Sequence, residues 1–271
     1  MKLIKTYPKY LQKHIKFFYS VQASALENIN SVHRRLPDGT LDVVFNLGAP
    51  VLFSSNGINF FEMPEVVLTG LHPDRSFLQY AGDVNLVGAV FQPGSAQLFV
   101  NDTLEQYKGC TANASQVFGN EVQLVYEQLK ETVGEKEKHT LLEKFLLTCL
   151  KKKDEYYSSR ISGVINQIHT LAGNIEMSTL YKDHFMSERT FRRKFNECVG
   201  MSPKLYSTII RVKSFSKRYE QIRSSYTNVL NELGYTDQSH FNKEFQKIVG
   251  TNPTAYFSQL TRMGTEFIHL I

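Results

Sequence analysis

Two stretches of the sequence carry side chains that can hydrogen-bond to the edges of nucleic-acid bases. The candidate base-reading residues are Arg189, Arg192, Arg193, Gln238, Ser239, Asn242 and Lys243. Arginine donates a bidentate pair of bonds to guanine O6 and N7, and an Asn or Gln amide pairs in the same way with adenine N6 and N7. Each of these residues alone is equally typical of a solvated surface. Arginines on one segment and amides on the other make a shared role in base recognition the better interpretation.

The two segments belong to an internal repeat with a period of fifty residues. Stretches 187–206 and 237–256 align without gaps. The identical pairs are Phe191/Phe241, Phe195/Phe245, Val199/Val249, Gly200/Gly250, Pro203/Pro253 and Tyr206/Tyr256. Phenylalanines four residues apart lie on one face of a helix and predict that this face is buried, which leaves the candidate residues pointing outward.

Each copy has the residues expected at the two ends of a helix. Ser187 and Asp237 are good N-cap residues, because their side-chain oxygens accept from the first unpaired amides. The glycines and prolines of the repeat predict where the helix stops. Short helices expected at 177–184 and 227–233 precede the copies, so each copy reads as a helix-turn-helix unit. A helical solenoid is the alternative, but solenoids generally need three or more repeats.

The N-terminal part has a different periodicity. Short strands are expected at 41–47, 66–69, 77–80 and 86–91, separated by turn residues, which favours a small barrel or sandwich. Helical spacing begins near residue 115 and predicts two helices, with the segment 134–136 between them and the second containing residues 141–149. An α+β chain is therefore predicted, with a β-rich domain carrying two helices ahead of an all-α domain.

A charge run at 151–155 marks the expected domain boundary, which gives domains of 1–153 and 159–271. Residues 160–271 contain 15 Lys and Arg against 9 Asp and Glu, a net charge of +6, whereas residues 1–159 contain 16 against 17, a net charge of −1. The whole basic excess therefore lies in the C-terminal part, where the charge alone suits a polyanionic partner and an idle basic surface equally well.

At these residues the chain resembles the AraC/XylS family of bacterial transcription regulators. The resemblance covers residues 160–257 and is strongest over 234–241, followed by Phe245, Gly250 and Pro253. It implies two helix-turn-helix subdomains joined by a long helix at about 203–221, with both recognition helices in successive major-groove segments. The base-reading positions implied are the candidates named above.

The chain departs from the family pattern at two places. Phe185 stands where a small turn residue is usual, and Ser214-Phe215-Ser216 stands in the linking helix where an alanine is common. We therefore expect the first unit to pack differently from the second.

The N-terminal half is similar to a domain often found ahead of this module, chiefly over residues 33–48, 69–71 and 90–94. The resemblance of the whole chain to these regulators implies a sequence-specific regulator that binds double-stranded DNA. Further expected partners are RNA polymerase, a small-molecule effector and a second copy of the chain. In related regulators the leading domain senses a small molecule or mediates self-association, and both roles remain open. No cofactor, metal, secretory signal or membrane span is expected, which predicts a cytoplasmic protein.

No catalytic residues are predicted. A DNA-repair alkyl acceptor is the enzymatic alternative, but it needs an activated cysteine thiolate, and Cys110, Cys149 and Cys198 lie in no such setting. A helical interaction module without DNA binding is the third alternative, and the basic excess argues against it.

Overall fold

The computed structural model describes residues 1–25, 32–70, 72–101, 103–109, 111–151, 155–184, 187–222, 226–235 and 237–263. The strands are β1 (Lys2–Thr6), β2 (Ile15–Ala23), β3 (Val32–Arg35), β4 (Asp42–Asn46), β5 (Val51–Ser54), β6 (Phe61–Glu62), β7 (Val66–Thr69), β8 (Ser76–Tyr80), β9 (Val84–Phe91) and β10 (Ala112–Asn113). The helices are η1 (Ala96–Leu98), η2 (Leu104–Tyr107), α2 (Ala114–Phe118), α3 (Glu121–Glu131), α4 (Glu135–Cys149), α5 (Glu155–Thr170), α6 (Met177–Asp183), α7 (Glu188–Val199), α8 (Pro203–Ile222), α9 (Tyr226–Glu232), α10 (Gln238–Val249) and α11 (Pro253–Met263).

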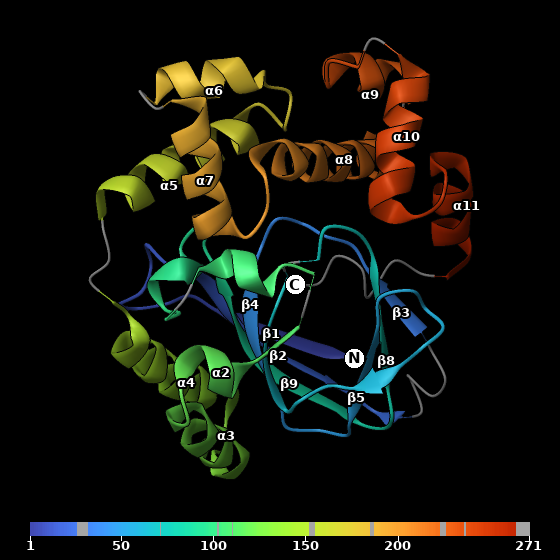
Figure 1. Cartoon of the computed structure of the whole chain (residues 1–271). Helices are drawn as coiled ribbons and strands as arrows, with labels where there is room; N and C mark the ends of the chain where they lie inside the picture. Colours follow the sequence, from blue (N-terminus) through green and yellow to red (C-terminus); the bar gives the residue numbers. More distant parts are fainter. Residues whose placement is uncertain are drawn as a thin grey trace.

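The strands form two antiparallel sheets. The larger sheet has the order β1-β2-β9-β4-β7-β10, and the smaller has the order β3-β8-β5-β6. Helices α2 to α4 pack at the side of the β-rich part, and α5 to α11 form a layer above it (Figure 1). This arrangement confirms the predicted α+β class, with a β-rich part followed by a helical part. Within the described part of the chain, no helix has both the length and the apolar content needed to cross a bilayer.

The larger sheet is buried on both faces. Successive side chains of a strand point to opposite sides, so one strand contributes residues to two different clusters. On β2, Phe18 packs with the helices α2 to α4, whereas Phe17, Tyr19 and Val21 belong to a second cluster on the other face. The second cluster includes Val51 of the smaller sheet. The alternation expected over 41–47 is confirmed, since Leu41, Val43 and Phe45 are buried in the first cluster and Leu47 packs against it.

A close approach across this sheet requires a glycine. Gly88 pairs with Tyr19 in the β2–β9 register, and the Tyr19 ring lies across it. A Cβ atom at position 88 would come within 2.5 Å of that ring. The glycine therefore lets the Tyr19 hydroxyl reach Asp42, to which it donates a hydrogen bond of 2.8 Å.

The helical part follows the sequence pattern closely. The short helices α6 and α9, the long helix α8 and the two repeat helices α7 and α10 lie where they were expected. One detail was wrong: the segment 134–136 does not separate the two N-terminal helices, because α4 already begins at Glu135. Gly134 alone has the positive φ, at 96°, that lets the chain turn into α4. The prolines of the repeat do more than end a helix, since Pro203 and Pro253 are the first residues of α8 and α11.

The β-rich and helical parts are in direct contact. Leu36 packs against the hydrophobic cluster of the helices, and the Lys213 ammonium of α8 lies 3.1 Å from the Asp38 carboxylate. The Arg75 amide donates to the carbonyl of Ile248 at the end of α10. Helix α7 lies against η1 and η2. The domain limits 1–153 and 159–271 stay a prediction, and the charge run expected to separate them lies partly outside the described residues.

A buried carboxylate attaches the N-terminal segment to α4. Glu143 accepts hydrogen bonds from the backbone amides of Lys9, Tyr10 and Leu11, at 3.1, 2.7 and 3.1 Å. His139, one turn earlier on α4, bridges the hydroxyls of Thr6 and Ser20. These bonds hold the loop between β1 and β2 against the helices.

We expect Glu143→Ala to lower the free energy of unfolding by about 2 kcal/mol, because it leaves amides of this loop without their acceptor. The midpoint of thermal unfolding should fall by about 4–8 °C. Glu131→Ala, at an exposed position on α3, is the matched control and should leave the midpoint within about 1 °C. Equal midpoints for the two variants would contradict the anchoring role of Glu143.

Candidate nucleic-acid interface

Both repeat helices begin with a side-chain cap and end with a left-handed glycine. The Ser187 hydroxyl accepts from the Thr190 amide at 3.3 Å, and the Asp237 carboxylate accepts from the Ser239 amide at 2.7 Å. At the other end, Gly200 and Gly250 adopt the left-handed conformation, with φ of 77° and 80°. The predicted caps are confirmed at both ends, so each helix has a defined start and length.

The repeated aromatic residues make equivalent contacts. Phe195 and Tyr206 meet edge to face with their ring centroids 5.7 Å apart, and Phe245 and Tyr256 do the same at 5.5 Å. All four phenylalanines of the repeat are fully buried. The identities found at an offset of fifty therefore correspond to one packing arrangement used twice, which turns one face of each helix inward.

The outward face of α7 carries the first set of candidates. Arg189, Arg192 and Arg193 are all exposed. The Arg192 guanidinium lies 2.6 Å from the Glu188 carboxylate, and Arg193 lies 2.8 Å from Glu197. A hydrogen bond with Tyr181, and then the charge of Glu188, raise the pKa of Arg192. These pairs orient the arginines along the helix surface while leaving their guanidinium groups at the solvent.

The outward face of α10 carries the second set, and its members are not equivalent. Gln238, Ser239 and Lys243 are exposed. Asn242 is half-buried, and its Oδ1 accepts a hydrogen bond of 2.8 Å from the Tyr226 hydroxyl of α9. Because a bidentate contact with adenine would need that oxygen, we expect Asn242 to position α9 against α10 more than to contact bases.

A partly buried ion pair fixes α10 to the long helix. Arg211 of α8 donates to both oxygens of Glu244, at 3.0 and 2.9 Å, and the Tyr235 hydroxyl donates to Glu244 at 2.7 Å. The guanidinium also lies over the Tyr235 ring, 4.5 Å from its centroid. Tyr235 lies in the segment 234–241 where the family resemblance is strongest and Glu244 follows that segment, but the resemblance did not predict that either contacts Arg211. The turn residue Phe185, singled out in the first unit, lies outside the described residues.

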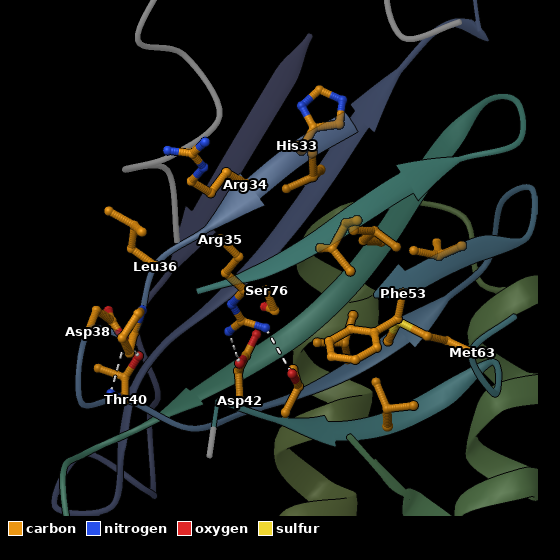
Figure 2. Close-up of a pocket in the computed structure, with 18 of the residues that line it drawn as sticks. His33, Arg34, Arg35, Leu36, Asp38, Thr40, Asp42, Phe53, Met63 and Ser76 are labelled. Atoms are coloured by element: carbon orange, nitrogen blue, oxygen red, sulfur yellow. Dashed lines mark hydrogen bonds and ion pairs between the residues drawn. The ribbon is translucent and has the colours of Figure 1, made fainter. Parts of the chain in front are cut away.

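A cavity of about 500 Å³ lies between the two sheets and is closed on one side by α8 and the end of α10. Arg35 of β3 reaches across it to Asp42, with Phe53 and Met63 opposite (Figure 2). The Arg35 guanidinium lies 2.7 Å from Asp42 and donates to the Thr69 hydroxyl at 2.9 Å. Burial acts to lower the pKa of Arg35, but the facing carboxylate outweighs it and raises that pKa. This cluster was missed from the sequence, although Arg35 and Asp42 fall in the segment 33–48 that was singled out.

Within the described residues, the candidate metal-ligating side chains are scattered and the cysteines are buried or half-buried. Among the described residues, no group of three or more His, Cys, Asp or Glu side chains could hold a metal ion. Burial raises the pKa of the Cys149 thiol, which opposes thiolate formation, and Cys198 is buried. Cys110 lies outside the described residues.

The fold and the paired, capped helices define a two-part protein with two helix-turn-helix units. Comparison with known families agrees: residues 181–259 match the model of a helix-turn-helix domain, and residues 8–112 match a domain of unknown function, DUF6597. These matches support an AraC-type regulator, as the resemblance at residues 234–253 predicted.

Several proteins are similar to this chain. An uncharacterized HTH-type transcriptional regulator of Haemophilus influenzae is 26% identical over 204 residues, which are 73% of this chain and 60% of that protein. The HTH-type transcriptional activator RhaS of Pectobacterium carotovorum is 29% identical over 65 residues, 24% of this chain and 23% of that protein. The chain thus spans less than two thirds of the length of these relatives. The structure of ToxT from Vibrio cholerae aligns with a TM-score of 0.48 and 9% identity, covering 90% of this chain and 99% of that one.

We expect Arg211→Met to destabilise the protein by about 3 kcal/mol, because it leaves Glu244 partly buried without its cation. Binding of the protein to DNA should weaken by about tenfold although Arg211 lies behind the recognition face, since α10 loses its orientation. Thermal unfolding and a gel-shift titration measure the two effects.

Arg218→Met is the matched control, because Arg218 lies on the same helix in a solvent-exposed pair with Glu232. That variant should lose no more than about 1 kcal/mol. If it behaved like Arg211→Met, the Arg211–Glu244 pair would have no special role in holding α10.

Proposed function

We propose that this protein is a sequence-specific DNA-binding transcription regulator. The observation that carries the proposal is that α7 and α10 share their caps and buried aromatic pair, and that both turn a polar face to solvent. Helices of this size fit the major groove, and two units in one chain suit two successive groove segments. The C-terminal excess of positive charge adds affinity for phosphates that falls as the salt concentration rises.

The two helices are suited to different bases. Arg189, Arg192 and Arg193 present guanidinium groups that match guanine, and Gln238 presents an amide that matches adenine. The ion pair of Arg192 with Glu188 orients that side chain along the surface of α7 before DNA arrives. The Asp237 cap leaves Gln238 at the first position of its helix, where recognition helices commonly meet base edges.

In vitro selection of bound sequences from a random DNA pool tests this proposal. We expect Arg192→Ala and Gln238→Ala each to relax the preference at one or two base positions, a loss of about 1–3 kcal/mol of discrimination per contact. Non-specific affinity should change much less, because phosphate contacts remain.

Two controls sharpen the selection experiment. Gln128→Ala removes an exposed amide from α3, and Arg218→Ala removes an exposed guanidinium from α8. Neither should change the selected motif. An unchanged motif for Arg192→Ala and Gln238→Ala as well would show that these helices do not read the sequence.

We further propose that the β-rich part modulates DNA binding through a small ligand or through self-association. It contacts both units, through η1 and η2 at α7 and through Arg75 at the end of α10. Contacts of this kind hold the two recognition helices in one relative orientation, so DNA binding loses less conformational entropy. RNA polymerase, a second copy of the chain and a cytoplasmic location remain predictions.

Gly39 offers a sharp test of this coupling. It has a φ of 79°, and a Cβ atom there would come within 2.9 Å of the Tyr206 ring at the contact between the two parts. We expect Gly39→Ala to loosen this contact and to weaken DNA binding by about fivefold or more, the size of a typical coupling free energy. The measurement is a gel-shift titration of the full chain.

Gly109→Ala is a matched control, because Gly109 has a similar φ of 75° but nothing within 4 Å of the added Cβ. The two variants share the strain of a non-glycine residue at positive φ. Equal DNA affinities for both variants would argue against modulation through this contact.

A further inference from the structure

We propose that the cavity between the sheets binds an uncharged, largely apolar small molecule, and that this ligand acts on the second helix-turn-helix unit. The inference deepens the proposed function and rests on it for the consequence at DNA, whereas ligand binding itself can be measured without DNA. Four features of the cavity carry it: its size, its balance of charge, the position of its polar group and the origin of its walls.

The size and the walls suit a small apolar molecule. The volume of about 500 Å³ lies within the range of pockets that enclose drug-sized ligands. Val21, Val44 and Leu86 line it from the larger sheet, and Phe53 and Leu78 from the smaller one. These side chains would remove the apolar surface of a bound molecule from water, which is the main source of its affinity.

The charged side chains that line the cavity balance one another. Four are cationic and four are anionic: Arg34, Arg35, Lys213, Lys217, Asp38, Asp42, Glu65 and Glu220. Arg35 is paired with Asp42 and Lys213 with Asp38, at 2.7 and 3.1 Å. Burial lowers the pKa of His33, which keeps that side chain neutral at pH 7. A charged ligand would bring a charge that the cavity does not match, and an unmatched buried charge is costly.

One polar group is placed to orient the ligand. The Asp42 side chain is only 2% exposed, and its two oxygens accept from Arg35 and from Tyr19. The Arg35 side chain lies in the cavity wall and is 28% exposed. The accessible side of this ion pair is therefore the hydrogen-bond donor. A carbonyl, ether or hydroxyl oxygen on the ligand would accept a bond there without adding charge.

The remaining walls come from the helical part and belong to one side of it. Val212 and Ser216 of α8, with Ile248 and Val249 of α10, complete the lining. No lining residue belongs to α7, which instead packs against η1 and η2 within the described structure. A ligand in the cavity would therefore hold α8 and α10 to the β-rich part and leave the first unit unaffected.

Fluorescence titration with two matched probes tests the ligand class. N-phenyl-1-naphthylamine is neutral, and 8-anilinonaphthalene-1-sulfonate has a similar ring system with one negative charge. We expect the neutral probe to bind the full chain saturably, and the anionic probe to bind about tenfold more weakly or worse. Equal affinity for both probes, or no saturable binding of the neutral one, would overturn the proposal.

Two variants that fill the cavity from opposite walls locate the site. Ser216→Phe projects from α8 and Val44→Phe from β4, and either should weaken neutral-probe binding by about tenfold or more. Ser214→Phe places the same ring on α8 at a position that does not line the cavity, and should bind the probe like the unaltered chain. Circular dichroism confirms that each variant is folded. Unchanged binding by both filled variants would place the probe elsewhere and refute this site.

Hydrogen exchange shows which unit the ligand reaches. With the neutral probe bound, peptides covering 205–220 and 245–256 should exchange more slowly, and peptides covering 188–199 should not change. Protection confined to the strands would refute the action on α8 and α10. These readouts need no DNA. Normal probe binding together with failed DNA selection would refute only the regulator proposal. Successful DNA selection without probe binding would refute only the cavity proposal.

Discussion

The long helix α8 packs against both helix-turn-helix units and against the β-rich part, and this constraint organises the molecule. Tyr206, Ile209 and Phe215 are fully buried along it, and even its hydroxyl residues Ser207 and Ser216 have little exposure. A helix with buried residues on several of its faces needs a packing partner for each of those faces. The first unit covers one end, the second unit covers the other, and the β-rich part covers the side between them. Each large buried side chain contributes about 2 kcal/mol of transfer free energy, so these contacts are strongly favoured.

The repeat produces two units that are alike inside and unlike outside. The phenylalanine and tyrosine pairs, the caps and the glycine stops are equivalent in the two copies. Their surroundings differ, because α7 rests on η1 and η2 whereas α10 is bound to α8 by the Arg211–Glu244 pair. The same fold therefore gives one unit rich in outward arginines and one that is held by a partly buried ion pair and lies beside the cavity.

The two faces of the larger sheet have separate roles. One face packs on α2 to α4 and provides the core of the β-rich part. On the other face Tyr19 lies over Gly88. This face is separated from the smaller sheet by the cavity. Close packing is the rule in protein interiors, so a cavity of this size with a polar cluster at one end is typical of a binding site. Because the cavity lies beside α8, a ligand bound there would contact the helix that packs against both helix-turn-helix units.

The local features of this protein were determined by the sequence alone. The caps at Ser187 and Asp237, the buried phenylalanines, the glycine stops and most strands near the predicted positions all depend on residues within a few positions of one another. The one error in the helices concerned the segment 134–136. The break between the two helices ends at Gly134, and α4 begins at the next residue. Only the tertiary structure decided the pairing of Arg211 with Glu244, of Arg35 with Asp42 and of Lys213 with Asp38, and the diversion of Asn242 toward Tyr226. Periodicity shows which face of an element is buried but not which element covers it, so contacts between distant segments require the assembled fold.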